Sequence, residues 1–104
     1  MNEDRLHQLQ AMLLKSPKDA FLLYGLAMEF KKKGQSQTAL DYLQQVIEVD
    51  PLYCYAYFQR GQIFENLGEP EDARKAYQLG IDAAGRKGDA HAQQELQGAL
   101  SMLE

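Results

Sequence analysis

Apolar residues recur along this chain at the three- and four-residue spacing of amphipathic helices, and glycine and proline separate the apolar stretches. No stretch of useful length alternates apolar and polar positions as a strand would. Because every connection between the apolar stretches is short, neighbouring helices are expected to run antiparallel. The pattern predicts an all-α protein with helices at 3–15, 18–33, 36–49, 52–67, 71–86 and 89–103.

Prolines and glycines mark the predicted helix ends. Each of the three prolines stands near an expected helix start, and Ser16 before Pro17 has the character of a cap. Gly34 and Gly68 stand where helices should end, since glycine readily takes the left-handed conformation of a helix C-terminus. Asp89 is expected to open the last helix.

Residues recur at a fixed period of 34 positions. Phe30 and Phe64 match, as do Gly34 and Gly68. Pro17, Ala39, Pro51 and Ala73 follow the same period. A period of this length is typical of stacked repeat proteins, so one helical hairpin is expected at 18–49 and a second at 52–86.

The terminal helices are expected to cover the two hairpins, because a stack of two would otherwise expose apolar ends. Helix 3–15 carries Leu6 and Leu9 at helical spacing and resembles the second helix of an earlier repeat. Helix 89–103 carries Leu96 and Leu100 on one side and is interpreted as a C-terminal capping helix. The whole chain, 1–104, is expected to form a single domain.

At this point the chain resembles the tetratricopeptide repeat (TPR) family. The first repeat matches the family pattern at Leu23, Leu26, Ala27, Phe30, Gly34, Ala39, Leu43, Val46 and Pro51. The second matches it at Tyr57, Gly61, Phe64, Gly68, Ala73 and Tyr77. The resemblance implies antiparallel helical hairpins stacked as a short solenoid, a right-handed superhelix with terminal capping helices. Small residues in this pattern let helices approach closely while large residues fill the adjoining grooves.

The second repeat departs from the first at three positions. Arg60 stands where the first repeat has Leu26. Gly80 stands where the first repeat has Val46 and is expected to loosen the second hairpin. Gly85 replaces the closing proline, so helix 71–86 is expected to run on or fray.

The resemblance also implies a binding surface, because the first helix of each TPR hairpin lines the concave face. Aromatic and methionine side chains that point away from the packing side are suited to a protein partner. The predicted protein-binding groove consists of Phe21, Tyr24, Met28, Lys31, Lys32, Tyr55, Phe58, Gln59, Gln62, Glu65 and Asn66. It is expected to bind an apolar or aromatic peptide segment of another protein, as an adaptor or scaffold would.

Two other uses of the same side chains stay open. The apolar face could pair two copies, which would make the chain a structural homodimerisation module. Leu96 and Leu100 of the last helix could instead cover some of the rings, which would make them ordinary packing residues.

One TPR subclass grips the acidic tail of chaperones with a clamp of basic residues and asparagine. The corresponding positions here are Tyr24, Met28, Gln59, Asp89 and Gln93, and none of them is basic. A carboxylate clamp needs cations to offset the desolvation of the carboxylate. Binding of chaperone tails through such a clamp is therefore not expected.

Composition and charge exclude several functions. The net charge is -4, whereas nucleic-acid binding normally needs a basic surplus, and the Lys31–Lys33 run is explained by the negative end of a helix. No apolar run of about 20 residues suggests a membrane span, and the acidic N-terminus lacks the features of a signal peptide, so a cytoplasmic protein is expected. His7, His91 and the lone Cys54 form no metal-binding or catalytic pattern, so neither a cofactor nor an enzyme activity is expected.

Overall fold

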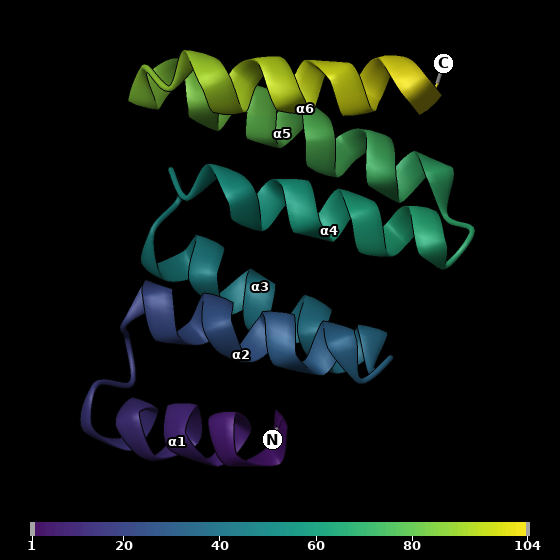
Figure 1. Cartoon of the computed structure of the whole chain (residues 1–104). Coiled ribbons are helices and arrows are strands. Elements are labelled where there is room, and N and C mark those ends of the chain that lie inside the picture. The colour runs from purple at the N-terminus through teal and green to yellow at the C-terminus, as the bar shows by residue number, and fades with distance from the viewer. Residues whose placement is uncertain (1, 104) are drawn as a thin grey trace. The chain divides into compact units, whose positions relative to one another are not determined.

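The computed structural model describes residues 2–103, with side chains from Asp4 onward, and these residues form six helices. The helices are α1 (Asn2–Lys15), α2 (Ala20–Lys32), α3 (Ser36–Val49), α4 (Cys54–Asn66), α5 (Pro70–Lys87) and α6 (Ala90–Leu103) (Figure 1). No strand occurs in this part of the chain. The all-α prediction is confirmed, and each helix begins and ends within two residues of its predicted position.

Left-handed glycines follow three of the helices, as their lack of a Cβ allows. Gly34 and Gly68 follow α2 and α4 with φ values of 77° and 73°, as predicted. The third left-handed glycine is Gly88, with φ of 79°, and it caps α5. Helix α5 runs past Gly85 to Lys87. The sequence predicted that this helix either runs on past Gly85 or frays there, and the structure shows that it runs on.

The start of α2 differs from the prediction that Ser16 is its cap. The cap is Asp19, whose Oδ1 accepts hydrogen bonds from the backbone N–H groups of Phe21 at 3.0 Å and Leu22 at 3.2 Å. Pro17 lies in a turn before the helix, closed by the N–H of Asp19 donating to the carbonyl of Ser16 at 3.1 Å. Proline suits the second position of such a turn because its φ is already fixed. The proline of this repeat therefore marks the turn that precedes a helix.

The chain divides into two compact units, residues 1–50 and residues 51–104, and each predicted hairpin lies within one unit. In the first unit, α2 packs against α1 and against α3 (Figure 1). Leu6 and Leu9 of α1 meet Leu22 and Leu26 of α2 in a buried apolar cluster. Helix α1 therefore covers the side of α2 that would otherwise expose leucines.

The contact between α2 and α3 uses small and aromatic residues. Ala27 and Ala39 are fully buried, in accord with a close approach of the two helices. Phe30 of α2 stacks on Tyr42 of α3 with ring centroids 5.5 Å apart and ring planes 7° apart. Stacking of this kind stabilises the pair beyond what the burial of its apolar surface contributes.

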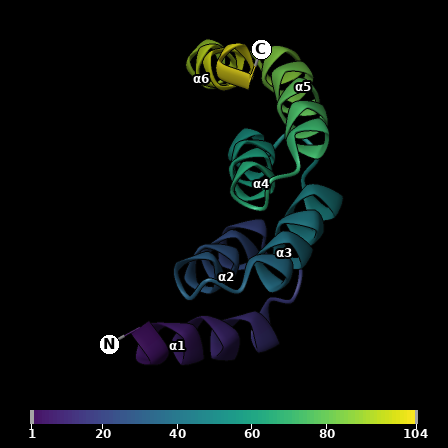
Figure 2. The same ribbon diagram turned by 90° about the vertical axis from the view of Figure 1, so that its right-hand side faces the viewer.

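In the second unit, α5 packs against both α4 and α6, and these two helices lie on the same side of α5 (Figure 2). Its buried cluster consists of Cys54, Ala73, Tyr77, Ala84, Ala92 and Leu96. Tyr77 is the largest side chain in this cluster that is fully buried. Arg60, at the repeat position of Leu26, places its guanidinium 5.4 Å from the centroid of the Phe64 ring, a cation–π contact.

Two glycines allow the close packing of the second unit. A Cβ at Gly61 would lie 2.5 Å from Cζ of Tyr77, well inside van der Waals contact. A Cβ at Gly80 would lie 2.8 Å from the Cβ of Tyr57 and 2.8 Å from Cδ2 of Leu96. The loosening predicted at Gly80 is therefore wrong, because side chains from α4 and α6 occupy the space that the glycine leaves.

Within the described residues, no helix has both the length and the apolar character that a membrane span requires. The cytoplasmic location expected from the sequence stays a prediction.

Candidate functional site

The exposed face of α2 carries the first part of the predicted groove. Phe21 is 72% exposed, and Tyr24 and Met28 are half-buried. Their spacing of three and four residues places these side chains on one side of the helix, about 10 Å from first to last. We call these three residues the α2 ridge. The neighbouring leucines, Leu22 and Leu26, point instead into the cluster with α1.

A charged cluster lies at the end of α2, next to the α2 ridge. Lys32 Nζ donates to Glu29 Oε2 at 3.3 Å, and Arg5 Nε of α1 donates to the same oxygen at 3.2 Å. The side chain of Glu29 is only 5% exposed, and its Oε1 has no hydrogen-bond partner among the described residues. Lys31 is half-buried, and this burial lowers the pKa of its ammonium group. One buried carboxylate thus joins α1 to the last turn of α2.

The aromatic residues predicted on α4 are partly covered by their own unit. Tyr55 and Phe58 both pack against the buried cluster that contains Tyr77 and Leu96. The Phe58 ring centroid lies 6.0 Å from that of Tyr77 and 6.5 Å from that of Tyr55. Coverage of these rings by Leu96 and Leu100 of the last helix was one alternative left open by the sequence. Both rings pack against the cluster that includes Leu96, and the ring contact of Phe58 within that cluster is with Tyr77 of α5.

A hydrogen bond fixes Tyr55 against α6. Its Oη donates to Glu95 Oε1 at 2.8 Å, and the same oxygen lies 3.0 Å from His91 Nε2. The hydrogen bond to Glu95 is the main reason why the pKa of Tyr55 rises to about 12, with burial and nearby negative charge adding to it. Tyr55 therefore contributes to the attachment of α6.

The polar residues predicted on α4 have mixed roles. Glu65 accepts a hydrogen bond from the Oη of Tyr77. Burial, followed by this hydrogen bond, raises the pKa of Tyr77, while a hydrogen bond with Gln62 acts in the opposite direction. Gln59 is half-buried and Asn66 is exposed. Glu65 and Gln62 thus support a core tyrosine in addition to any role at the surface.

Two positions that correspond to the chaperone-tail clamp have local structural roles. Asp89 Oδ1 accepts a hydrogen bond from the N–H of Ala92 at 3.0 Å, as at the start of a helix. Gln93 Nε2 donates to the carbonyl of Ile81 at 3.4 Å. The first bond caps the start of α6, and the second joins α6 to α5.

The structure thus brings the predicted residues together in two sets that belong to different units. Phe21, Tyr24 and Met28 share a face of α2 in the first unit, with the lysines beside them. Tyr55 and Phe58 share a face of α4 in the second unit and contact its core. Of the two sets, the α2 ridge is the one with a strongly exposed ring.

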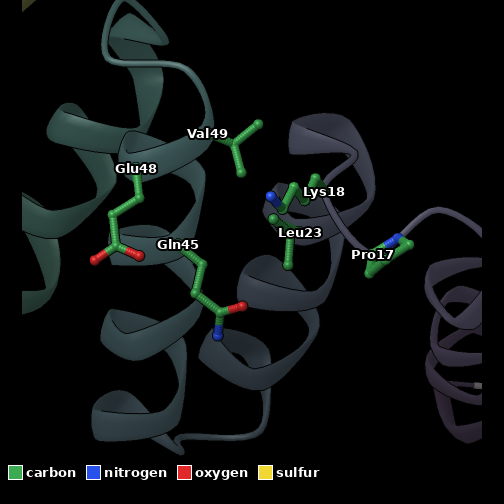
Figure 3. A pocket seen from close by; sticks show the side chains of 6 residues that line it. All are labelled: Pro17, Lys18, Leu23, Gln45, Glu48 and Val49. Carbon is green, nitrogen blue, oxygen red and sulfur yellow. The ribbon is translucent and has the colours of Figure 1, made fainter.

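A hollow in the first unit was not predicted from the sequence. It is an open hollow of about 610 Å³ where the turn before α2 faces the last turns of α3 (Figure 3). The lining residues are Pro17, Lys18, Leu23, Gln45, Glu48 and Val49. The sequence signal that could have found it is the hairpin period, which places the start of α2 beside the end of α3.

The described side chains include no group of three His, Cys, Asp or Glu residues that could hold a metal ion. Cys54 is buried, and its Sγ donates to the carbonyl of Leu52 at 3.4 Å. The surfaces described above therefore offer apolar contact, hydrogen bonding and charge pairing.

Comparison with known protein families gives two matches, both described as tetratricopeptide repeat. One covers residues 19–52 and the other covers residues 42–75. A TPR repeat-containing protein of Pseudomonas aeruginosa is 30% identical to this chain over 96 residues, which make up 92% of this chain and 91% of that protein.

Solved structures show the same fold. A tetratricopeptide repeat domain protein from Salinibacter ruber, solved by NMR, has 34% identity and a TM-score of 0.80, with 85% of this chain and 89% of that chain covered. The TPR2B domain of yeast Sti1, in a complex with pHsp70, has a TM-score of 0.87 at 16% identity, with 94% of this chain and 78% of that chain covered. At that identity the likeness to the yeast domain concerns the fold alone.

Proposed function

This chain belongs to the tetratricopeptide repeat family, and on that premise we propose that its α2 ridge binds an apolar or aromatic segment of another protein. Tetratricopeptide repeats are generally protein-interaction modules. The role proposed for this chain is that of an adaptor that brings a partner segment to its surface and has no catalytic activity of its own.

The exposure of Phe21 is the observation that carries the proposal. A phenylalanine ring that is 72% exposed leaves most of its apolar area in contact with water. Covering such a ring is worth about 2 kcal/mol, and the half-buried Tyr24 and Met28 extend the surface available to a partner. Residues of these types are enriched at the centres of protein interfaces.

The related fold in yeast Sti1 supports capture of a partner by this architecture, because that domain is in a complex with pHsp70. The partner chemistry proposed here differs. The clamp positions in this chain are not basic, and Asp89 and Gln93 make hydrogen bonds within the second unit. We therefore expect a partner segment held mainly by apolar contacts.

Affinity capture from the native cell tests the proposal. The double variant Phe21→Ala with Met28→Ala removes apolar side chains from the α2 ridge, and we expect it to lose the proteins that the wild type captures. A matched control, Leu14→Ala with Met102→Ala, removes two side chains that are 86% and 90% exposed elsewhere on the surface. Undiminished capture by the ridge variant would overturn the proposal.

Phe58 is a poor choice for this test, although the sequence places it in the groove. Its ring contacts Tyr77 and the buried cluster of the second unit, so Phe58→Ala would cost packing energy as well as any partner contact. Loss of capture by that variant could follow from instability alone.

A second copy of the chain is the alternative occupant of the α2 ridge. Light scattering over a range of micromolar concentrations separates the two cases. A wild-type dimer that becomes a monomer in the Phe21→Ala, Met28→Ala variant would replace the adaptor role with homodimerisation.

A further inference from the structure

We propose that the partner segment is acidic at one end, with apolar side chains over the α2 ridge and aspartate or glutamate side chains over a cationic turn beside it. The cationic turn consists of Arg5, Lys31, Lys32 and Lys33. This inference rests on the proposed function and specifies the chemistry of its partner.

The cationic turn is built by two helices. Lys31 and Lys32 occupy the last turn of α2, and Lys33 is its C-cap. Arg5 reaches the same place from α1, since its Nε and the Nζ of Lys32 donate to one oxygen of Glu29 at 3.2 Å and 3.3 Å. Four cationic side chains thus gather at one end of the first unit.

The carboxylates described at this end do not balance the cations. Glu29 is buried and is shared by Arg5 and Lys32, whose side chains remain more than half exposed. Asp4, the neighbour of Arg5 in sequence, is the described acid of α1 that lies nearest to the cationic turn along the chain. Among the described side chains, these two carboxylates stand against four cations, in a chain whose net charge is -4. An anionic partner is attracted to this end of the unit, whereas a cationic one is repelled.

The environment of Lys31 adds to this preference. Burial lowers the pKa of its ammonium group, which means that the charged form is partly stripped of water. A carboxylate brought close to a partly dehydrated ammonium interacts with it more strongly than with a fully hydrated one.

Two residues of the cationic turn, Lys31 and Lys32, continue the α2 ridge along one side of the helix. Lys31 follows Met28 by three residues and Lys32 follows it by four, the spacings that place side chains on the same face. The distance along the helix from Phe21 to Lys31 is about 15 Å, which a helical segment of about 10 residues or an extended one of about 5 would span. At the other end Asp19 is already used to cap α2. The expected partner is therefore apolar near the start of α2 and acidic near its end.

Synthetic peptides and the full-length protein test the inference. The probe is a fluorescein-labelled peptide with leucines followed by glutamates, compared with counterparts that carry glutamine or lysine in place of glutamate. Fluorescence anisotropy should give the tightest binding for the glutamate peptide, about fivefold tighter than for the glutamine peptide, with a preference that weakens as salt is added.

Matched protein variants locate the effect. Lys31→Gln with Lys33→Glu changes the charge of the cationic turn and leaves the Glu29 pairs in place, whereas Lys87→Gln with Lys75→Glu makes the same change of net charge on α5. The first pair should remove the preference for glutamate, and the second should keep it. Circular dichroism of each variant confirms that the helices are retained.

The outcomes separate the two proposals. Equal binding of the glutamate and glutamine peptides, with loss of both in Phe21→Ala, Met28→Ala, overturns the acidic partner and keeps the apolar one. If neither the ridge variant (Phe21→Ala, Met28→Ala) nor the cationic-turn variant (Lys31→Gln, Lys33→Glu) changes peptide binding, both the apolar and the acidic partner proposals are overturned. Failure of the glutamate peptide to bind, preference for the lysine peptide, or binding of anionic phospholipid vesicles in place of the peptide also overturns the acidic partner.

Discussion

At the scale of single residues, Gly61 is the glycine at which an added Cβ would meet the closest neighbouring atoms. The ring of Tyr77 occupies the position that a Cβ would take, and Tyr77 is the largest fully buried residue in the cluster of the second unit. The sequence pattern predicted a small residue here, and the structure shows which ring requires it. Gly98 of α6 has the opposite environment, with no atom close to its missing Cβ.

We predict that Gly61→Ala lowers the free energy of unfolding by about 3 kcal/mol, because the new methyl group would overlap the Tyr77 ring. Gly98→Ala is the matched control. Both changes add one methyl group within a helix, and in open space alanine should raise stability by about 0.5 kcal/mol. Urea denaturation followed by circular dichroism measures both. Equal effects of the two changes would show that the close approach of Gly61 and Tyr77 does not affect the free energy of unfolding.

Tyr55 should make stability depend on pH in alkaline solution. Its pKa rises from an ordinary value of 10.0 to about 12 in the folded protein, chiefly through its hydrogen bond to Glu95. The unfolded chain therefore releases this proton at lower pH than the folded one. The stabilisation is complete below pH 10 and is lost as the pH rises toward 12.

Ultraviolet titration of tyrosinate checks the prediction, with the difference between wild type and Tyr55→Phe isolating this residue. We expect a midpoint near pH 12 for Tyr55, and a lower midpoint when Glu95→Gln removes the carboxylate. A midpoint of 10 with Glu95 intact would contradict the hydrogen bond between α4 and α6.

At the scale of helices, α1 is held to α2 by leucines and by one buried carboxylate. Leu6 and Leu9 supply the apolar contact, and Glu29 accepts hydrogen bonds from Arg5 and Lys32. Because Oε1 of Glu29 has no partner among the described residues, the carboxylate is incompletely compensated for its loss of water. The apolar contact is therefore expected to supply most of the attachment of α1.

We predict that Arg5→Ala with Lys32→Ala lowers the free energy of unfolding by about 1–2 kcal/mol, because it leaves a buried charge without cations. The partial exposure of both cations keeps this value below that of a fully buried pair. Glu29→Met removes the charge and should change stability by less than about 1 kcal/mol. Urea denaturation compares the two variants, and a larger loss for Glu29→Met would contradict this account.

At the scale of the whole molecule, the chain consists of two compact units, each with its own buried cluster. In repeat proteins of this kind each element contacts mainly its neighbours, so a local loss of packing is felt most strongly nearby. Leu96 of α6 is fully buried in the cluster of the second unit, whereas Met102 of the same helix is 90% exposed.

We predict that Leu96→Ala costs about 3 kcal/mol and accelerates amide hydrogen exchange more in residues 51–104 than in residues 1–50. Met102→Ala is the matched control and should leave exchange unchanged. Mass spectrometry of exchanged peptides measures both effects. Equal acceleration in the two units would show that the molecule opens as one cooperative body.

Much of the fold could be predicted from the sequence because the signals are local. Apolar spacing predicted the helices, and glycines predicted the ends of α2 and α4. The 34-residue period predicted the hairpins and the family. In the candidate site, the same spacing predicted that Phe21, Tyr24 and Met28 share one face of α2.

The remaining features depend on distances between residues far apart in the chain, and only the tertiary structure decided them. The packing at Gly80 requires Tyr57 and Leu96 from two other helices, and the covering of Phe58 requires Tyr77. The buried pairing of Glu29 depends on Arg5, which lies 24 residues away in sequence. Periodicity records which side of a helix a residue occupies, but the neighbour that fills the space beside it is set by how the helices pack.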